Sequence, residues 1–109
     1  MNLAFLKGLT DGYLAAIPSS ADRPDGPLGF AIQMPSEGAG QNLLGVLSKT
    51  GFTQLKLEHA RIFIRKRWYV SGLSSPVQYH ASDIHRWLDT MDNLARKHGG
   101  TLETWFPGA

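Results

Sequence analysis

The chain has 109 residues and a net charge of +2, and 42% of its residues are hydrophobic against 18% charged. This length allows one domain with one hydrophobic core, and the composition excludes a largely disordered chain. The absence of cysteine excludes disulfides, thiolate metal sites and thiol nucleophiles, and it fits the cytoplasmic location that we expect for this protein.

Residues 1–27 are predicted to form an N-terminal helical segment followed by a linker. Apolar residues recur at a loose helical spacing from Leu3 to Ile17, which predicts one or two short helices. Lys7 and Asp11 interrupt the apolar run that a secretion signal needs, and no run of about 18 apolar residues follows that would span a membrane. Residues 18–27 are rich in proline, serine and aspartate, which is typical of a linker. We therefore expect the folded domain at residues 28–109.

The domain is predicted to begin with a strand and a helix. Residues 28–34 alternate apolar with small or polar side chains, which is typical of a strand with one packed face. A helix is expected next, with Ser36 as its N-cap and with Gly51 in the left-handed conformation that ends it.

Two further strands are predicted at residues 52–57 and 61–71, with a hairpin turn at Glu58 and His59. This part of the chain is basic: residues 49–73 hold six basic residues and one acidic residue, whereas the rest holds five basic and eight acidic residues. The charge is therefore +5 in the middle of the chain and −3 elsewhere.

The last two predicted elements are an amphipathic helix and a strand, within residues 82–106. Ser82 is the expected N-cap, and Gly99 is the expected left-handed residue after the helix. Trp87 lies on the apolar face of this helix and is predicted to be in the core, whereas Trp105 could either close the core or lie exposed.

The order of these elements predicts an α+β fold of the ferredoxin-like βαββαβ type, a four-stranded antiparallel sheet with two helices on one face, plus the N-terminal helical appendage. The second face of such a sheet is uncovered. The N-terminal segment, a protein partner or a ligand could cover it.

The residues predicted to bind a partner come from the predicted strand at residues 61–71, because arginine and tyrosine are common anchors of protein interfaces. They are Arg61, Phe63, Arg65, Lys66, Arg67 and Tyr69. Aromatic rings between basic residues are also typical of sheets that bind single-stranded nucleic acid, which is the alternative function. A solvated strand with no ligand has the same pattern.

Other residues give little sign of catalysis. Tyr79, His80, Asp83 and His85 form a cluster of polar groups, but their spacing matches no strong metal motif. Neither a GxSxG nucleophile motif nor a phosphate-binding GxxxxGK[ST] loop occurs in the chain. We therefore expect no catalytic residue, metal site or cofactor.

Three motifs resemble the regulator of ribonuclease E activity B family. They are FAIQMPSEGAGQNLLGVLSKTGF at residues 30–52, Trp68-Tyr69-Val70, and Leu94-Ala95-x-x-His98-Gly99-Gly100 followed by Trp105. The resemblance, over residues 28–106, implies a ferredoxin-like binding domain without catalysis, which in the best-known member inhibits ribonuclease E by binding it. That family is strongly acidic, whereas the middle of this chain is basic, so we expect a different protein partner, such as another nuclease or a toxin. Immunity proteins and phage-encoded inhibitors act in the same way, by covering another protein.

Overall fold

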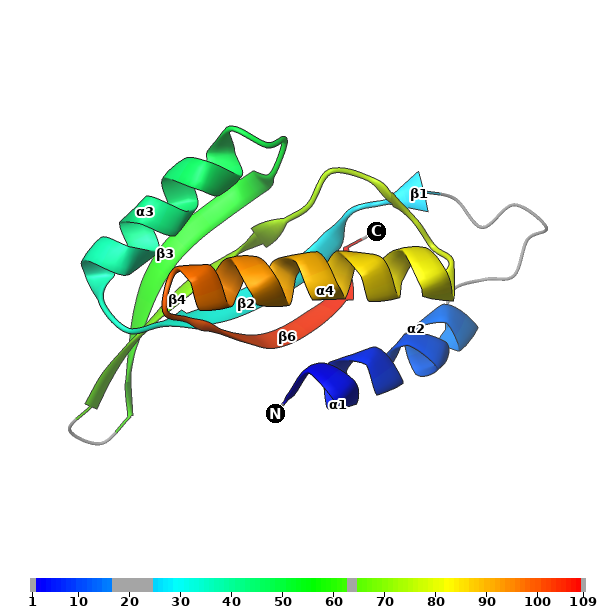
Figure 1. Ribbon diagram of the computed structural model, residues 1–109, viewed down its shortest axis with the longest axis horizontal. Coiled ribbons are helices and arrows are strands. Elements are labelled where there is room, and N and C mark those ends of the chain that lie inside the picture. Colours follow the sequence, from blue (N-terminus) through cyan, green and yellow to red (C-terminus); the bar gives the residue numbers. More distant parts are fainter. Residues whose placement is uncertain (1, 17–24, 63–64, 109) are drawn as a thin grey trace.

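The computed structural model of this chain describes residues 2–16, 25–62 and 65–108, and it has an α+β fold with a four-stranded antiparallel sheet (Figure 1). The strand order is β3-β4-β2-β6. These strands are β2 at Leu28–Met34, β3 at Thr53–Ile62, β4 at Arg65–Leu73 and β6 at Thr101–Pro107. The two longer helices are α3 at Glu37–Ser48 and α4 at Ala81–Lys97.

Strand β2 is the centre of the hydrophobic core, as its alternating pattern predicts. Leu28, Phe30, Ile32 and Met34 are each at most 3% exposed. Because β2 pairs with β4 on one side and β6 on the other, these side chains join Val70, Leu102 and Trp105 in one cluster. The buried faces of α3 and α4 contribute to the same cluster, through residues such as Leu43 and Leu88.

The predicted N-cap of helix α3 and the left-handed conformation of Gly51 are confirmed, although the helix itself ends at Ser48 with Lys49 as its C-cap. The Ser36 hydroxyl accepts a hydrogen bond from the Ala39 backbone N–H at 3.2 Å, and Gly51 has a φ of +84°. Gly40 has a packing role that the sequence did not indicate. A Cβ there would lie 2.5 Å from Cδ1 of Leu57, so this glycine lets α3 approach β3 closely.

The predicted hairpin turn at Glu58 and His59 is wrong. Both residues continue the β3–β4 ladder, where Glu58 pairs with Tyr69 and His59 with Trp68, and the chain reverses between Ile62 and Arg65. β3 lies at the edge of the sheet, where polar side chains reach solvent without breaking the strand. Polarity at these positions therefore marks an exposed part of a longer strand.

Helix α4 begins earlier than predicted. Its N-cap is His80, which makes no side-chain capping bond, and Ser82 lies inside the first turn. The Ile84 N–H donates to the His80 carbonyl at 3.0 Å, which adds this turn to the helix. The left-handed conformation predicted for Gly99 is confirmed, with a φ of +78°, and Trp105 is completely buried.

The N-terminal segment contains two seven-residue helices, α1 at Asn2–Gly8 and α2 at Thr10–Ala16. Figure 1 shows them side by side with α4, and α1 also contacts β6. Trp105 Nε1 donates a 2.7 Å hydrogen bond to the Leu6 carbonyl, and the Tyr13 ring packs edge-on against the same indole. Described residues of this segment therefore dock on α4 and β6.

A two-stranded ladder corrects the end of the predicted linker. β1 at Asp25–Gly26 pairs with β5 at Val77–Gln78, although the linker is predicted to reach residue 27. The Tyr79 hydroxyl, which donates to the Pro27 carbonyl at 2.9 Å, reinforces this junction. Linker residues 18–24 lie outside the described part of the chain. None of the helices in the described ranges is long and apolar enough to cross a membrane.

Thr10 provides the first test of this packing. The residue is 1% exposed, and its hydroxyl has no hydrogen-bond partner among the described residues. Valine has the same shape without the polar group, so Thr10→Val should raise the free energy of unfolding by about 1 kcal/mol. Chemical denaturation measures this change. Thr10→Ser, which keeps the hydroxyl and loses a methyl group, should lower stability, and a loss of stability in Thr10→Val would contradict the interpretation.

Candidate binding face

The second face of the sheet carries the side chains that alternate with the core residues. The register of the strands defines this set, and each member is partly or fully exposed. We call it the open face, and its described residues are Ala31, Gln33, Thr53, Lys56, Glu58, Ala60, Arg67, Tyr69, Ser71, Leu73, Thr101, Thr104 and Phe106.

Two of the six predicted partner-binding residues have described side chains, and both lie on the open face. Arg67 pairs with Ala60, and Tyr69 pairs with Glu58 on one side and Gln33 on the other. Phe63 lies outside the described residues, as do the side chains of the other three predicted residues. Their backbones place Arg61 opposite Lys66 and Arg65 opposite Ile62.

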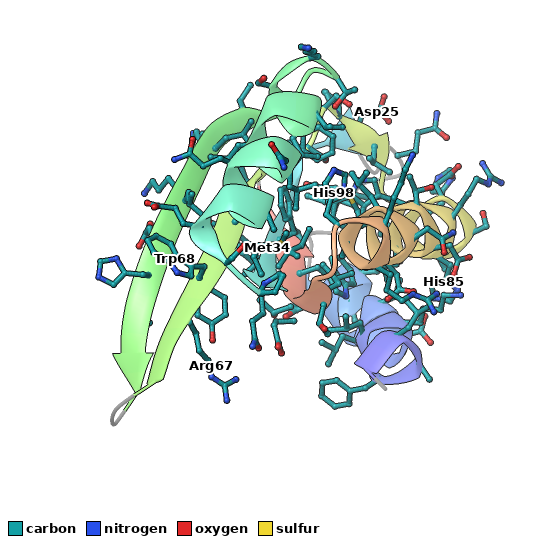
Figure 2. The ribbon with its side chains drawn as sticks, turned by 60° about the vertical axis from the view of Figure 1, so that its left-hand side comes forward. Asp25, Met34, Arg67, Trp68, His85 and His98 are labelled. Atoms are coloured by element: carbon teal, nitrogen blue, oxygen red, sulfur yellow. The ribbon has the colours of Figure 1, made fainter. Side chains whose placement is uncertain are left out.

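Arg67 is held across the sheet by a hydrogen bond. Its Nη1 donates to Oε1 of Gln33 at 3.2 Å, which links β4 to β2 on the open face. Figure 2 shows the Arg67 side chain extending away from α3, whereas Met34 lies between α3 and α4. One guanidinium group is thus positioned beside Tyr69 while remaining partly exposed.

Trp68, next to Arg67, belongs to the opposite side of the hairpin. It is half-buried against the core cluster, and its ring centroid lies 5.0 Å from that of His59. The alternation predicted for β4 therefore holds for residues 67–70. The prediction that residues 61–71 form one continuous strand is wrong because the chain reverses between residues 62 and 65.

A shallow hollow of about 420 Å³ lies on the open face beside β6. Phe106, 44% exposed, covers Gly29, where a Cβ would lie 2.3 Å from the phenyl ring. Lys56 and Gln54 line the hollow from β3, where a β-bulge lies between Thr53 and Lys56 and Gln54 has a φ of +52°. The hollow therefore combines an aromatic ring, aliphatic carbon, an amide and one ammonium group.

Sequence reasoning missed this hollow because all four strands contribute to it, and long-range pairing in the order β3-β4-β2-β6 brings them together. Period-two alternation could have shown that Phe106 and Trp105 lie on different faces of the sheet. It could not show that Phe106 covers Gly29 of the neighbouring strand. The bulge in β3 shifts the register by one residue, and no turn residue announces it.

The polar cluster around the start of α4 does not converge on one point. Tyr79 is buried and donates to Pro27, whereas the exposed His80 lies 3.5 Å from Asp83. Over the described ranges, no group of three or more histidine, aspartate or glutamate side chains could hold a metal ion.

The carboxylates along α4 are engaged with basic residues. Asp92 is within ion-pair distance of Arg96, at 2.6 Å, and Asp89 is within ion-pair distance of Lys7 of α1, at 2.7 Å. The second of these links the N-terminal helices to α4.

Comparisons of the chain with known protein families, with curated proteins and with solved structures gave no match. The resemblance to the regulator of ribonuclease E activity B family stays a prediction that rests on the three motifs.

Proposed function

We propose that the chain is a small non-catalytic protein-binding regulator or inhibitor on a ferredoxin-like scaffold. The strand order β3-β4-β2-β6, with α3 between β2 and β3 and α4 between β4 and β6, supports this fold. The common core of α3, α4 and the sheet supports the same assignment, because it leaves the other face of the sheet for binding.

The observation that carries the function is the composition of the open face. Tyr69, Leu73 and Phe106 supply aromatic and aliphatic surface, and Arg67 and Lys56 lie beside them. Interfaces between proteins combine such apolar anchors with arginine at the centre and polar groups at the rim. The shallow hollow next to Phe106 would receive one side chain of the partner.

The partner would be another protein of the cytoplasm, such as a nuclease or a toxin, and the mechanism would be occlusion of its surface. The basic residues around the open face suit an acidic patch on that partner. The resemblance to the ribonuclease regulator family and the general behaviour of immunity proteins and phage inhibitors are consistent with this mode of action.

Single-stranded nucleic acid on the open face is the second candidate, and one observation weighs against it. Glu58 lies directly opposite Tyr69, so a strand stacked on this tyrosine would place phosphate beside a carboxylate. The described basic side chains of the open face are Lys56 and Arg67, and Glu58 offsets one of these two charges.

Capture of a partner from the native host, followed by affinity measurements on the purified complex, tests the proposal. Replacing Arg67 by glutamate and Tyr69 by alanine should weaken binding about 30-fold or more, since each residue is a typical interface anchor. The matched control changes Lys97 to glutamate and Phe5 to alanine, a basic residue and an aromatic residue exposed on α4 and α1. Equal affinity of the two double variants would show that the open face is not the binding surface.

A further inference from the structure

Strand β3 forms a free edge of the sheet in the described part of the chain. Its neighbour is β4 on one side, and α3 packs over the face that carries Leu57. At the opposite edge of the sheet, β6 is accompanied by α1. Figure 2 shows β3, in green, as the outermost strand, with no helix or strand drawn along its outer side. Every second residue of β3 therefore presents an N–H and a C=O group with which another strand can pair.

The regular part of this edge carries one formal charge of each sign. The regular β3–β4 ladder begins at Lys56, after the bulge, and both Lys56 and Glu58 are exposed on the open face. Leu57 lies between them and projects to the other face, where it is partly buried and lies against Gly40 of α3. Two opposite charges thus lie at equal distances on either side of an apolar residue.

Symmetry limits the ways in which β3 can pair with a second copy of itself. Directly opposite residues of an antiparallel pair project from the same face, so a two-fold axis must pass beside one residue that lies opposite itself. An axis at Lys56 would oppose two ammonium groups, and an axis at Glu58 would oppose two carboxylates. An axis at His59 would place Glu58 opposite Ala60. Only an axis at Leu57 places Lys56 of each copy directly opposite Glu58 of the other.

We propose that the chain forms a symmetric dimer in which β3 pairs antiparallel with β3 of a second copy, centred on Leu57. Two Lys56–Glu58 pairs then flank the axis on the open face, with their Cβ atoms about 5 Å apart, and the two Leu57 side chains meet on the helical face. The ladder is short because the bulge before Lys56 bends each strand. An interface of this size is weak, so we expect a Kd on the order of 100 µM.

This dimer goes beyond the partner binding proposed for the open face. The axis is perpendicular to the sheet, so two four-stranded sheets join edge to edge and their open faces lie on the same side. The dimer would therefore present two binding faces to a partner that has a repeated surface, which increases the apparent affinity. The pairing of β3 with its copy needs no partner, so the purified protein alone is sufficient to test it.

Charge reversal with sedimentation equilibrium tests the register on the full chain, at up to about 1 mM protein, well above the expected Kd. Lys56→Glu alone or Glu58→Lys alone makes both cross-strand pairs like-charged and should weaken self-association at least about tenfold. The double variant carrying both changes restores opposite charges and should associate within about threefold of the parent protein. An equimolar mixture of the two single variants should recover to the same extent, because each variant then meets complementary charges.

Introduced thiols test the same register independently, since the chain has no cysteine. A mixture of Lys56→Cys and Glu58→Cys should form a disulfide-linked dimer at least about fivefold faster than either variant alone. In the mixture the two thiols lie directly opposite, about 5 Å apart at Cβ, whereas in either variant alone they are diagonal neighbours, about 7 to 8 Å apart. Equal rates in the mixture and in the single variants would contradict a centre at Leu57.

Two control variants separate this pairing from the effect of net charge. Lys97→Glu and Asp25→Lys change exposed residues of α4 and β1 by the same amounts of charge, and both should self-associate like the parent. The proposal would be overturned by a parent protein that stays monomeric at about 1 mM, or by a mixture of charge-reversed variants that associates no better than its components. If the parent stayed monomeric while Lys56→Glu lost affinity for a captured partner, the edge would bind a strand of that partner. Because self-association is measured without a partner, its failure would leave the function proposed for the open face unaffected.

Discussion

Replacing Trp105 by alanine is expected to lower the free energy of unfolding by about 4 kcal/mol, the largest effect of any single change that we predict. The indole is completely buried between the sheet, α4 and the N-terminal helices. Its removal deletes the packing against Tyr13 and leaves the Leu6 carbonyl without the hydrogen bond from Nε1. Urea denaturation followed by circular dichroism measures the loss.

The same substitution should release α1 and α2 from the domain. Helices of seven residues are unstable alone, so their structure depends on contacts with α4, β6 and Trp105. Limited proteolysis should cut within residues 2–16 much faster in Trp105→Ala than in the parent protein. Trp87→Ala is the control, because Trp87 is only half-buried and its ring packs against Phe30 of β2. Equal protection of residues 2–16 in both variants would contradict the proposed role of Trp105.

Gly100→Ala is expected to destabilise the protein by about 3 kcal/mol, because the new methyl group has no space. A Cβ at this position would lie 2.5 Å from the Gln33 carbonyl oxygen and 2.7 Å from Sδ of Met34. The first of these atoms belongs to the backbone of the central strand and cannot move without disturbing the pairing of β2 with β6. Thermal and urea denaturation both report the change.

Two other glycines separate this steric effect from backbone strain. Gly99 has a φ of +78° and a Cβ there would meet Pro35 Cγ only at 3.4 Å, so Gly99→Ala should cost about 1 to 2 kcal/mol, mainly through its conformation. Gly45 lies exposed in α3 with open space around it, and Gly45→Ala should raise stability by up to about 1 kcal/mol. The Gly100 interpretation would be wrong if Gly100→Ala cost no more than Gly99→Ala.

Local patterns predicted most of the elements but not all of their ends. The spacing of Ile84, Leu88 and Met91 correctly predicts the buried face of α4, because helical periodicity is a property of the chain itself. The predicted start of this helix was wrong. Ser82 is a good N-cap residue in isolation, but the helix begins at Ala81. The position of a helix cap depends on which backbone N–H groups remain unpaired. Both tertiary packing and the type of residue at the cap decide which groups these are.

The candidate binding face was only partly predictable for a related reason. Alternation placed Arg67 and Tyr69 on one face, since side chains in a strand alternate whatever its partner. The hairpin was misplaced because a polar pair in an edge strand resembles a turn. Phe106 and Gln54 were missed because the bulges and the pairing that bring them to the open face involve residues far apart in the chain.

The sequence alone is enough to predict the α+β character, the buried faces of β2 and α4, and the concentration of positive charge between residues 49 and 73. These depend on composition and on short-range periodicity. Three features required the folded chain: the reversal after Ile62, the hydrogen bond by which Trp105 holds α1, and the β-bulge that brings Gln54 and Lys56 to the open face. Strand pairing and the packing of distant segments set these features, and neither is a local property of the sequence.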